Sequence, residues 1–401
     1  MSELQKAMLK GKIAIPLFRR PRTGHAYGDA VAEEEEEEEE TEGSQTGTYA
    51  PSDSEVKSET EFALPARIPR RQSYTAVPWS DYWATCSTAP LTTPESEFTI
   101  YSTPPHTPLG ADTGPVWFIF HHGAGSSALT FSLTADALHK ELPHIGVAAH
   151  DARGHGMTRN TGDDSDMSLS TLARDFVCMT AHILASSSSQ AEVVFVGHSL
   201  GGAVATEAVV NLDTYWPANT PAIKPTISGL VVLDVVEGSA MEALGSMLAY
   251  LRTRPQRFRS VSDAIRWHVR SHTVRNGVSA QVSVPGIVRG VPGSTEVAWI
   301  TDLAATEPFW AGWFAELSGK FLRARAGRML VLAGTDRLDR ELTVGQMQGK
   351  YQLEVFGETG HFVQEDAPQR LAMLLAQFLQ RNRKGAADAL RALNFAVHAQ
   401  V

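Results

Sequence analysis

The sequence predicts an α/β domain with a mostly parallel central sheet and helices on both faces. Short continuous apolar runs, such as Val116-Trp117-Phe118-Ile119-Phe120, are typical of strands buried on both faces. Helical patterns, such as 172–184 and 203–212, lie between most of these runs. Strands that alternate with helices favour a parallel sheet. The expected strands span 116–120, 146–149, 193–196, 230–233, 329–333 and 353–356.

The chain is predicted to contain one large folded domain between two tails. Residues 1–76, with a run of glutamates at 33–40 and few large apolar side chains, are expected to form a disordered acidic tail. The folded domain is expected at 77–381, closed by a helix at 369–378. The gap between strands 230–233 and 329–333 is too long for one helix, so a cap insert is expected at about 239–320. Residues 382–401 are expected to form a helix-prone C-terminal tail.

Composition argues against several classes of protein. The formal net charge is −10, and the glutamate run supplies most of it, so the folded part lacks the basic stripe of a nucleic-acid-binding protein. Two cysteines, Cys86 and Cys178, fit free thiols in a reducing compartment. The sequence shows neither the apolar core of a signal peptide nor a stretch of about 18 apolar residues. We therefore expect no membrane span, and a cytoplasmic location that can extend to the nucleus.

The strongest local signal is Gly197-His198-Ser199-Leu200-Gly201, which matches G-x-S-x-G. An expected strand precedes it and a helical pattern follows it, as a serine on a sharp strand-to-helix turn requires. A dinucleotide-binding turn would need the different spacing G-x-G-x-x-G. The pattern therefore predicts an α/β-hydrolase fold in which Ser199 is the nucleophile.

Two further turns supply the partners that such a serine needs. His122-Gly123-Ala124-Gly125 follows the strand 116–120, and we expect the backbone amides of Ala124 and Leu200 to form the oxyanion hole. His361 lies after the last expected strand and before the last helix, which predicts it as the general base. We expect no cofactor and no metal, because His121-His122 has no further ligands at matching spacing.

The acid of the triad has two candidates. Asp336 follows the strand 329–333, where most α/β hydrolases place this residue, and position alone favours it. Asp234 directly follows the strand 230–233. Both aspartates keep the chain order serine, acid, histidine.

Several segments that are not general to the fold resemble those of the protein phosphatase methylesterases, over about residues 77–380. These segments are Val77-Pro78-Trp79-Ser80, Leu233-Asp234-Val235-Val236-Glu237-Gly238-Ser239-Ala240-Met241, Arg254-Pro255-Gln256, Leu332-Ala333-Gly334-Thr335-Asp336-Arg337-Leu338-Asp339, Gly345-Gln346-Met347-Gln348-Gly349-Lys350 and Gly360-His361. The chain departs from that family at Leu200, where methionine is common, and in its glutamate-rich tail.

The resemblance implies a serine carboxylesterase that removes the methyl ester from the C-terminal leucine of the type 2A protein phosphatase catalytic subunit. It implies that this subunit is also a binding partner, and that the triad of the free enzyme is misaligned until the partner binds. It assigns the acid to Asp234, which reverses the preference from position and leaves Asp336 in reserve.

Two other functions compete with this interpretation. One is a general small-ester or lipid hydrolase of the same fold with a different cap. The other is a non-catalytic phosphatase-binding protein with an idle elbow, although binding alone would require neither Ser199 nor His361. In the cap, Trp267, Trp299, Trp310 and Trp313 are expected either to form the substrate wall or to fill the cap core.

Overall fold

The computed structural model describes residues 74–90, 96–106, 114–160, 165–334 and 338–398. All of them belong to one compact unit of the chain. Most of the expected acidic tail, residues 1–73, lies outside the described residues, so its disorder stays a prediction.

The described residues form one large sheet with the strand order β1-β2-β4-β3-β6-β7-β11-β12. Every neighbouring pair from β4 to β12 is parallel, which confirms the predicted sheet, whereas β1 and β2 form an antiparallel edge. The strands are β1 (Thr85–Pro90), β2 (Ser96–Thr103), β3 (Val116–His121), β4 (Ile145–His150), β6 (Glu192–His198), β7 (Thr226–Leu233), β11 (Gly327–Leu332), β12 (Gln352–Val355) and the short β5 (Arg159–Asn160), which pairs with β2.

The edge strands β1 and β2 were not among the expected strands. Most of β1 is solvent-exposed, and its sequence is polar for most of its length. A strand with one solvated face does not produce the continuous apolar run that marks a strand buried on both sides. The sequence pattern therefore located the parallel strands of the large sheet, including the edge strand β12, and missed the antiparallel pair β1 and β2.

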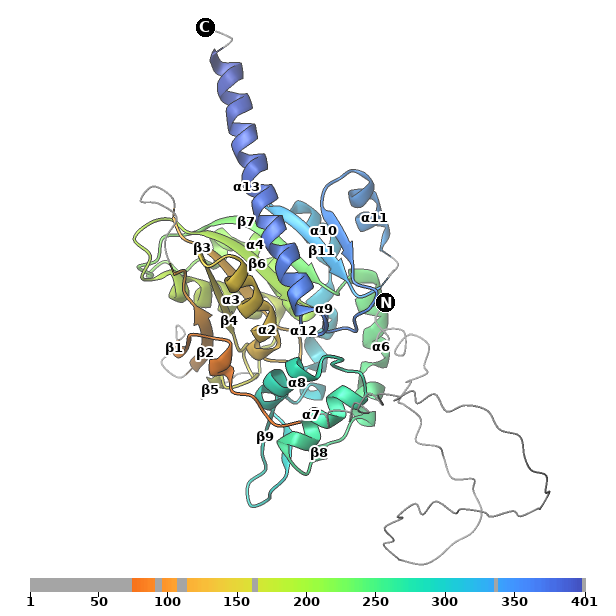
Figure 1. Cartoon of the computed structure of the whole chain (residues 1–401). Helices are drawn as coiled ribbons and strands as arrows, with labels where there is room; N and C mark the ends of the chain where they lie inside the picture. Colours follow the sequence, from red (N-terminus) through yellow and green to blue (C-terminus); the bar gives the residue numbers. More distant parts are fainter. Residues whose placement is uncertain (1–73, 91–95, 107–113, 161–164, 335–337, 399–401) are drawn as a thin grey trace, which may run out of the picture. The chain divides into compact units, whose positions relative to one another are not determined.

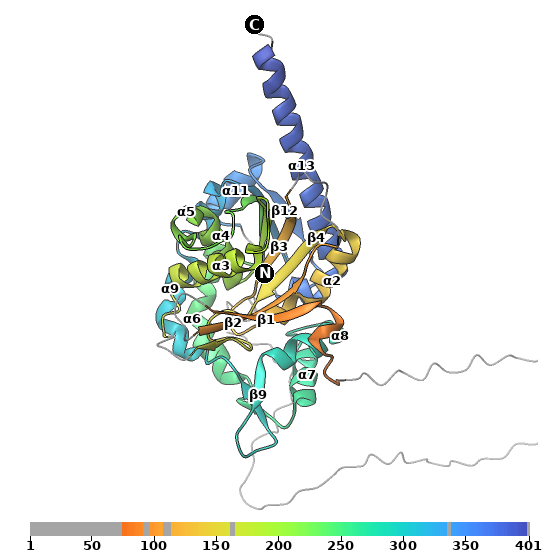
Figure 2. The same ribbon diagram turned by 90° about the vertical axis from the view of Figure 1, so that its left-hand side faces the viewer.

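Side chains of the central strands alternate between two hydrophobic cores. Trp117 and Ile119 of β3 pack with α3 (Leu169–Leu184) and α4 (Leu200–Val210) on one face. Phe118 and Phe120 point to the other face, against α2 (Ser132–Glu141) and α13 (Pro368–His398). Figure 2 shows the sheet between these two helical layers. Alternation along a strand places successive side chains on opposite faces, so an entirely apolar strand serves both layers.

The segment between β7 and β11 builds a cap with its own hydrophobic core, which includes Phe258, Ile265 and Val284. In Figure 1 the cap elements α7, α8, β8 and β9 lie together beside the sheet. The last helices of the segment differ, because Trp310, Trp313 and Phe321 belong to the main core. The elements are α6 (Glu237–Thr253), β8 (Arg257–Phe258), α7 (Val261–Arg270), α8 (Gly277–Ser283), η3 (Val284–Gly286), β9 (Val288–Gly290), β10 (Val297–Trp299), η4 (Ala304–Phe309), α9 (Trp310–Phe314) and α10 (Leu317–Arg323).

Helix α13 differs from the expected helix at 369–378 followed by a separate tail from 382. It is a single helix of 31 residues, Pro368–His398. Arg383 donates to Glu192 through both Nε (2.9 Å) and Nη2 (2.7 Å), which ties the helix to the start of β6 beyond the expected end. The residues at 379–384 contain no glycine or proline that would end a helix. The expected helix end at 378 is therefore wrong, and α13 runs through the expected domain boundary near residue 382.

Short elements complete the described chain. Within it, no helix is long and apolar enough to cross a membrane. Cys86 is exposed, Cys178 is half-buried, and both are free thiols, as predicted. The remaining elements are η1 (Trp79–Asp81), η2 (Ala128–Phe131), α5 (Leu212–Tyr215), α11 (Arg340–Met347) and α12 (Val363–Asp366).

Candidate active site

Ser199 occupies a strained turn between β6 and α4. Its φ of 53° and ψ of −122° are unusual for a residue with a side chain. Its amide donates to the Leu233 carbonyl (2.9 Å), and its own carbonyl accepts from the Gly202 amide (2.8 Å). A Cβ on Gly197 would lie 2.0 Å from the Gly201 carbonyl oxygen, and a Cβ on Gly201 would lie 2.1 Å from the His121 carbonyl oxygen. The turn therefore depends on both glycines of the motif.

The two expected oxyanion donors lie on either side of this serine. Leu200 is the first residue of α4, where backbone amides have no partner within the helix. On the other side, a Cβ on Gly123 would come within 3.1 Å of Ser199 Cβ, so the loop after β3 passes close to the serine. Ala124, the next residue of that loop, lines the same cavity as Ser199.

Asp234 and His361 are brought together at the carboxyl ends of β7 and β12. The Nδ1 atom of His361 lies 2.7 Å from Oδ2 of Asp234, whose side chain is fully buried. The other oxygen of Asp234 accepts from the Ala333 amide (2.8 Å), which fixes the carboxylate. With the proton of the imidazole on Nδ1, its Nε2 atom is left as an acceptor. Asp336, the reserve acid, lies outside the described residues.

His198, the residue before the nucleophile, holds the loop that carries His361. Its Nε2 atom donates to the His361 carbonyl (2.8 Å), and the two rings lie 4.6 Å apart. Burial, and then the charge of His361, holds the pKa of His198 well below its usual value. A neutral His198 therefore serves as a structural donor.

Ser199 and His361 line one cavity, yet within the described chain no hydrogen bond joins the Ser199 hydroxyl to the imidazole. A general base must come within about 3 Å of the proton that it takes. A small movement is therefore required before proton transfer. The expectation that a partner produces it stays a prediction.

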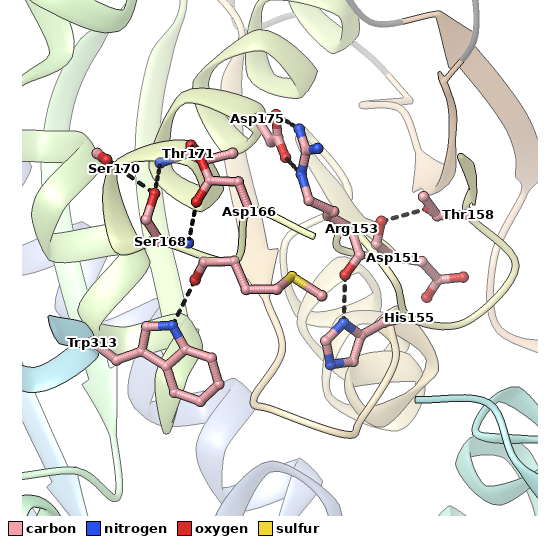
Figure 3. A network of polar contacts seen from close by, with 11 residues as sticks. Asp151, Arg153, His155, Thr158, Asp166, Ser168, Ser170, Thr171, Asp175 and Trp313 are labelled. Carbon is pink, nitrogen blue, oxygen red and sulfur yellow. Dashed lines mark hydrogen bonds and ion pairs between the residues drawn. The ribbon is translucent and has the colours of Figure 1, made fainter. Parts of the chain in front are cut away.

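A second loop, which sequence reasoning did not single out, supports the oxyanion loop. It follows β4 and contains Asp151, Arg153 and His155 (Figure 3). His155 accepts from the Gly125 amide through Nε2 (2.9 Å), and its Nδ1 donates to the Arg153 carbonyl (2.7 Å). Burial lowers the pKa of His155 to about 4, so the ring remains a neutral acceptor at pH 7.

A sequence signal for this loop was present. Gly154 and Gly156 both have positive φ, and they lie a few residues after the expected strand 146–149. This spacing is typical of a tight turn at the active edge of the sheet. His122 accepts from the Ala152 amide through Nε2 (2.9 Å) and joins the same two loops.

The cavity between the hydrolase core and the cap encloses about 140 Å³. Its lining is mainly apolar. The core supplies Ser199, His361 and Glu365, and the cap residues that line it include Met247, Tyr250, Leu251, Arg254, Trp267, Val284, Ile287 and Trp299. Within the described chain, no group of three or more His, Cys, Asp or Glu side chains is arranged to hold a metal ion.

Glu365 links the cap to the core at this cavity. Its carboxyl group accepts from Thr130 Oγ1 (2.5 Å) in the core and from Ser283 Oγ (2.6 Å) in α8. Burial raises the pKa of Glu365 to about 8. The group is therefore predominantly neutral at pH 7.

Comparison with known proteins agrees with this geometry. Residues 118–374 match the alpha/beta hydrolase family. Two solved structures share the fold, each with a TM-score of 0.55. E-2-(acetamidomethylene)succinate hydrolase is 16% identical, and the match covers 74% of this chain and 100% of that one. A peroxisomal alpha-beta-hydrolase from Saccharomyces cerevisiae is 15% identical, and the match covers 74% of this chain and 87% of that one.

Curated relatives are much more similar in sequence. Protein phosphatase methylesterase 1 of Aspergillus oryzae is 43% identical over 96% of this chain and 91% of its own length. The protein of the same name from Schizosaccharomyces pombe is 47% identical over 66% of this chain and 74% of its own. The chain belongs to the protein phosphatase methylesterase family. It is accordingly a carboxylic ester hydrolase, and the resemblance found in the sequence is confirmed.

The four tryptophans of the inserted segment of this esterase divide into two pairs. Trp267 and Trp299 line the cavity. Trp310 and Trp313 are buried in the main core, where their indole nitrogens donate to Thr306 Oγ1 (2.8 Å) and the Met167 carbonyl (2.7 Å; Figure 3). Trp267 and Trp299 therefore both line the cavity and pack against the cap core, whereas Trp310 and Trp313 lie in the main core and not in the expected cap core.

Replacing Gly197 with alanine tests the elbow. The new methyl group would collide with the backbone of Gly201, and we expect the free energy of unfolding to fall by about 3 kcal/mol, with loss of esterase activity. Gly245→Ala is the matched control, because nothing lies within 4 Å of its added Cβ and it sits inside α6. That variant should gain about 0.5–1 kcal/mol. Urea denaturation measures both, and equal stability of the two variants would contradict the turn geometry.

The raised pKa of Glu365 predicts a pH-dependent stability. Between the usual pKa of a glutamate and about 8, the folded state binds more protons than the unfolded state, so this group's contribution is lost as pH rises. Glu365→Gln keeps a neutral side chain at every pH. Relative to wild type, its free energy of unfolding should rise between pH 5 and 8 by up to about 1.4 kcal/mol per pH unit. Glu242→Gln, exposed on α6, controls for the loss of one carboxyl group. If the free energy of unfolding of Glu365→Gln and that of wild type depend on pH in the same way, the raised pKa of Glu365 is refuted.

Proposed function

We propose that this esterase removes the methyl ester from the C-terminal leucine of the type 2A protein phosphatase catalytic subunit, giving methanol and a free carboxylate. The observation that carries the proposal is the buried Asp234–His361 pair beside Ser199 on its strained turn. The printed name of the relatives, protein phosphatase methylesterase, supports a phosphatase as the substrate.

In the proposed mechanism, Ser199 attacks the ester carbonyl while Nε2 of His361 takes its proton. Asp234 orients the imidazole and stabilises its charged form. The amides of Ala124 and Leu200 receive the oxyanion, each worth roughly 3 kcal/mol in the transition state. Methanol leaves with a proton from His361. Water then cleaves the acyl-enzyme by the same steps, and the free carboxylate departs.

The cavity suits an ester whose acyl part is apolar. Leu251, Val284 and Ile287 line it, and Glu365 adds a neutral carboxyl group at pH 7. A leucine side chain would replace water on these apolar surfaces. A methyl ester needs little room for its leaving group, which fits the small enclosed volume of about 140 Å³.

The test compares Ser199→Ala, Asp234→Asn and Asp336→Asn on a carboxymethylated type 2A phosphatase. We expect Ser199→Ala to lower kcat by about 10⁴-fold or more and Asp234→Asn by about 10³- to 10⁴-fold. Asp336→Asn should change kcat by less than about threefold. Methanol release measures the rate, and co-precipitation of the phosphatase with Ser199→Ala measures binding.

Each rival has its own outcome in this experiment. Loss of activity only with Asp336→Asn would move the acid to that residue. Far higher activity on p-nitrophenyl butyrate than on the phosphatase would identify a general ester or lipid hydrolase. Unchanged demethylation by Ser199→Ala would exclude catalysis at this site and leave only a binding role.

A further inference from the structure

The cap presents an unneutralised guanidinium to the active-site cavity. Arg254, directly after α6, lines the cavity with Ser199 and His361. Its guanidinium carbon lies 4.2 Å from the centre of the Trp299 ring. Trp299 is itself fixed, because its indole nitrogen donates to the Pro255 carbonyl (2.7 Å). Within the described chain, the guanidinium has no hydrogen bond and no carboxylate at ion-pair distance.

Tyr250 places a second donor beside it. Tyr250 and Arg254 are four residues apart at the end of α6, a spacing that brings side chains to one side of a helix. Both residues line the cavity, and the charge of Arg254 acts on the pKa of Tyr250, which burial raises. The hydroxyl of Tyr250 makes no hydrogen bond within the described residues. The two side chains therefore offer adjacent donors without acceptors.

Among the described residues that line the cavity, no carboxylate compensates this charge. Burial raises the pKa of Glu365 to about 8 and lowers that of His268 to about 4, so both are mainly neutral at pH 7. Asp234 is bound to His361. The charge of Asp302 does act on Arg254, but Asp302 is exposed and one of its oxygens already accepts from the amides of Ala304 and Ala305.

Arg254 is half-buried, and within the described chain its guanidinium has no carboxylate at ion-pair distance, so an anionic ligand in the cavity would gain a charge-assisted hydrogen bond there. We propose that Arg254 and Tyr250 bind the carboxylate of an acidic side chain in the substrate, upstream of the methyl ester. This inference rests on the proposed function, because it concerns a peptide ester in the same cavity. The planar guanidinium supplies paired N–H donors that match a carboxylate, and the tyrosine hydroxyl adds a further donor.

A purely structural role for Arg254, packing on Trp299, makes a different prediction. Loss of packing would lower stability and would affect acidic and neutral substrates alike. Recognition of a carboxylate instead changes KM for acidic substrates and leaves kcat nearly constant. Charge preference is therefore the measurement that separates the two roles.

The experiment uses a pair of synthetic peptides that end in leucine methyl ester and differ only in glutamate against glutamine upstream. We expect the wild-type full chain to prefer the acidic peptide by about 10- to 100-fold in kcat/KM, through KM. Arg254→Gln should abolish the preference by raising KM for the acidic peptide to the value for the neutral peptide. Arg254→Lys should retain part of the preference, and Tyr250→Phe should reduce it by several-fold. Arg252→Gln, exposed in the last turn of α6, is the matched control and should behave as wild type.

A binding measurement separates this inference from the proposed function. In the Ser199→Ala background, calorimetry with the same peptides should show the acidic preference, and adding Arg254→Gln should remove it. Equal binding of the two peptides by Ser199→Ala, or a preference that survives Arg254→Gln, would overturn the role of Arg254. The free acid of the neutral peptide is the product of its cleavage. If Arg254 is needed to bind this free acid, Arg254 recognises the carboxylate of the product and not an acidic side chain, and the proposed role is equally overturned. If wild type cleaves neither peptide nor the methylated phosphatase, the proposed function fails and this inference falls with it.

Discussion

The turn at Ser199 is the constraint on which the rest of the site depends. A residue with a side chain at φ 53° is unfavourable, and the surrounding backbone must hold it there. The Leu233 carbonyl does so from the end of β7, and the absence of side chains at Gly197 and Gly201 lets strand, helix and neighbouring loop approach closely. The same β7 end carries Asp234, so one strand junction positions both the nucleophile and the acid of the proposed triad.

Buried polar side chains then position the loops around the serine. His198 binds the backbone of His361, and His155 binds the amide of Gly125 on the oxyanion loop. Both histidines are neutral because burial penalises their charged forms. A neutral imidazole can donate at one nitrogen and accept at the other, which lets His155 join the Gly125 amide to the Arg153 carbonyl. The loops at the carboxyl edge of the sheet are thereby held without a charge that would compete with the reaction.

The cap contributes the part of the site that distinguishes one ester from another. Glu365 bonds to both cap and core, so the cavity between them has a defined wall. Trp267 and Trp299 supply apolar surface, and Arg254 supplies charge. In the proposed function, the core therefore supplies the reacting groups, and the interface with the cap supplies the surface that selects the substrate.

The sequence by itself determined the fold class, the parallel strands and the strand-to-helix turn at Ser199, and it predicted His361 as the base, because each leaves a local pattern of apolar runs or glycine spacing. It did not determine the acid from position, since Asp234 and Asp336 both follow expected strands. The family resemblance favoured Asp234, and only the tertiary structure showed this carboxylate against Nδ1 of His361. The support from His155, the division of the tryptophans, and the unpaired Arg254 were likewise decided by tertiary structure. These depend on contacts between residues far apart in the chain, and the burial that neutralises a histidine or isolates an arginine leaves no periodic signal.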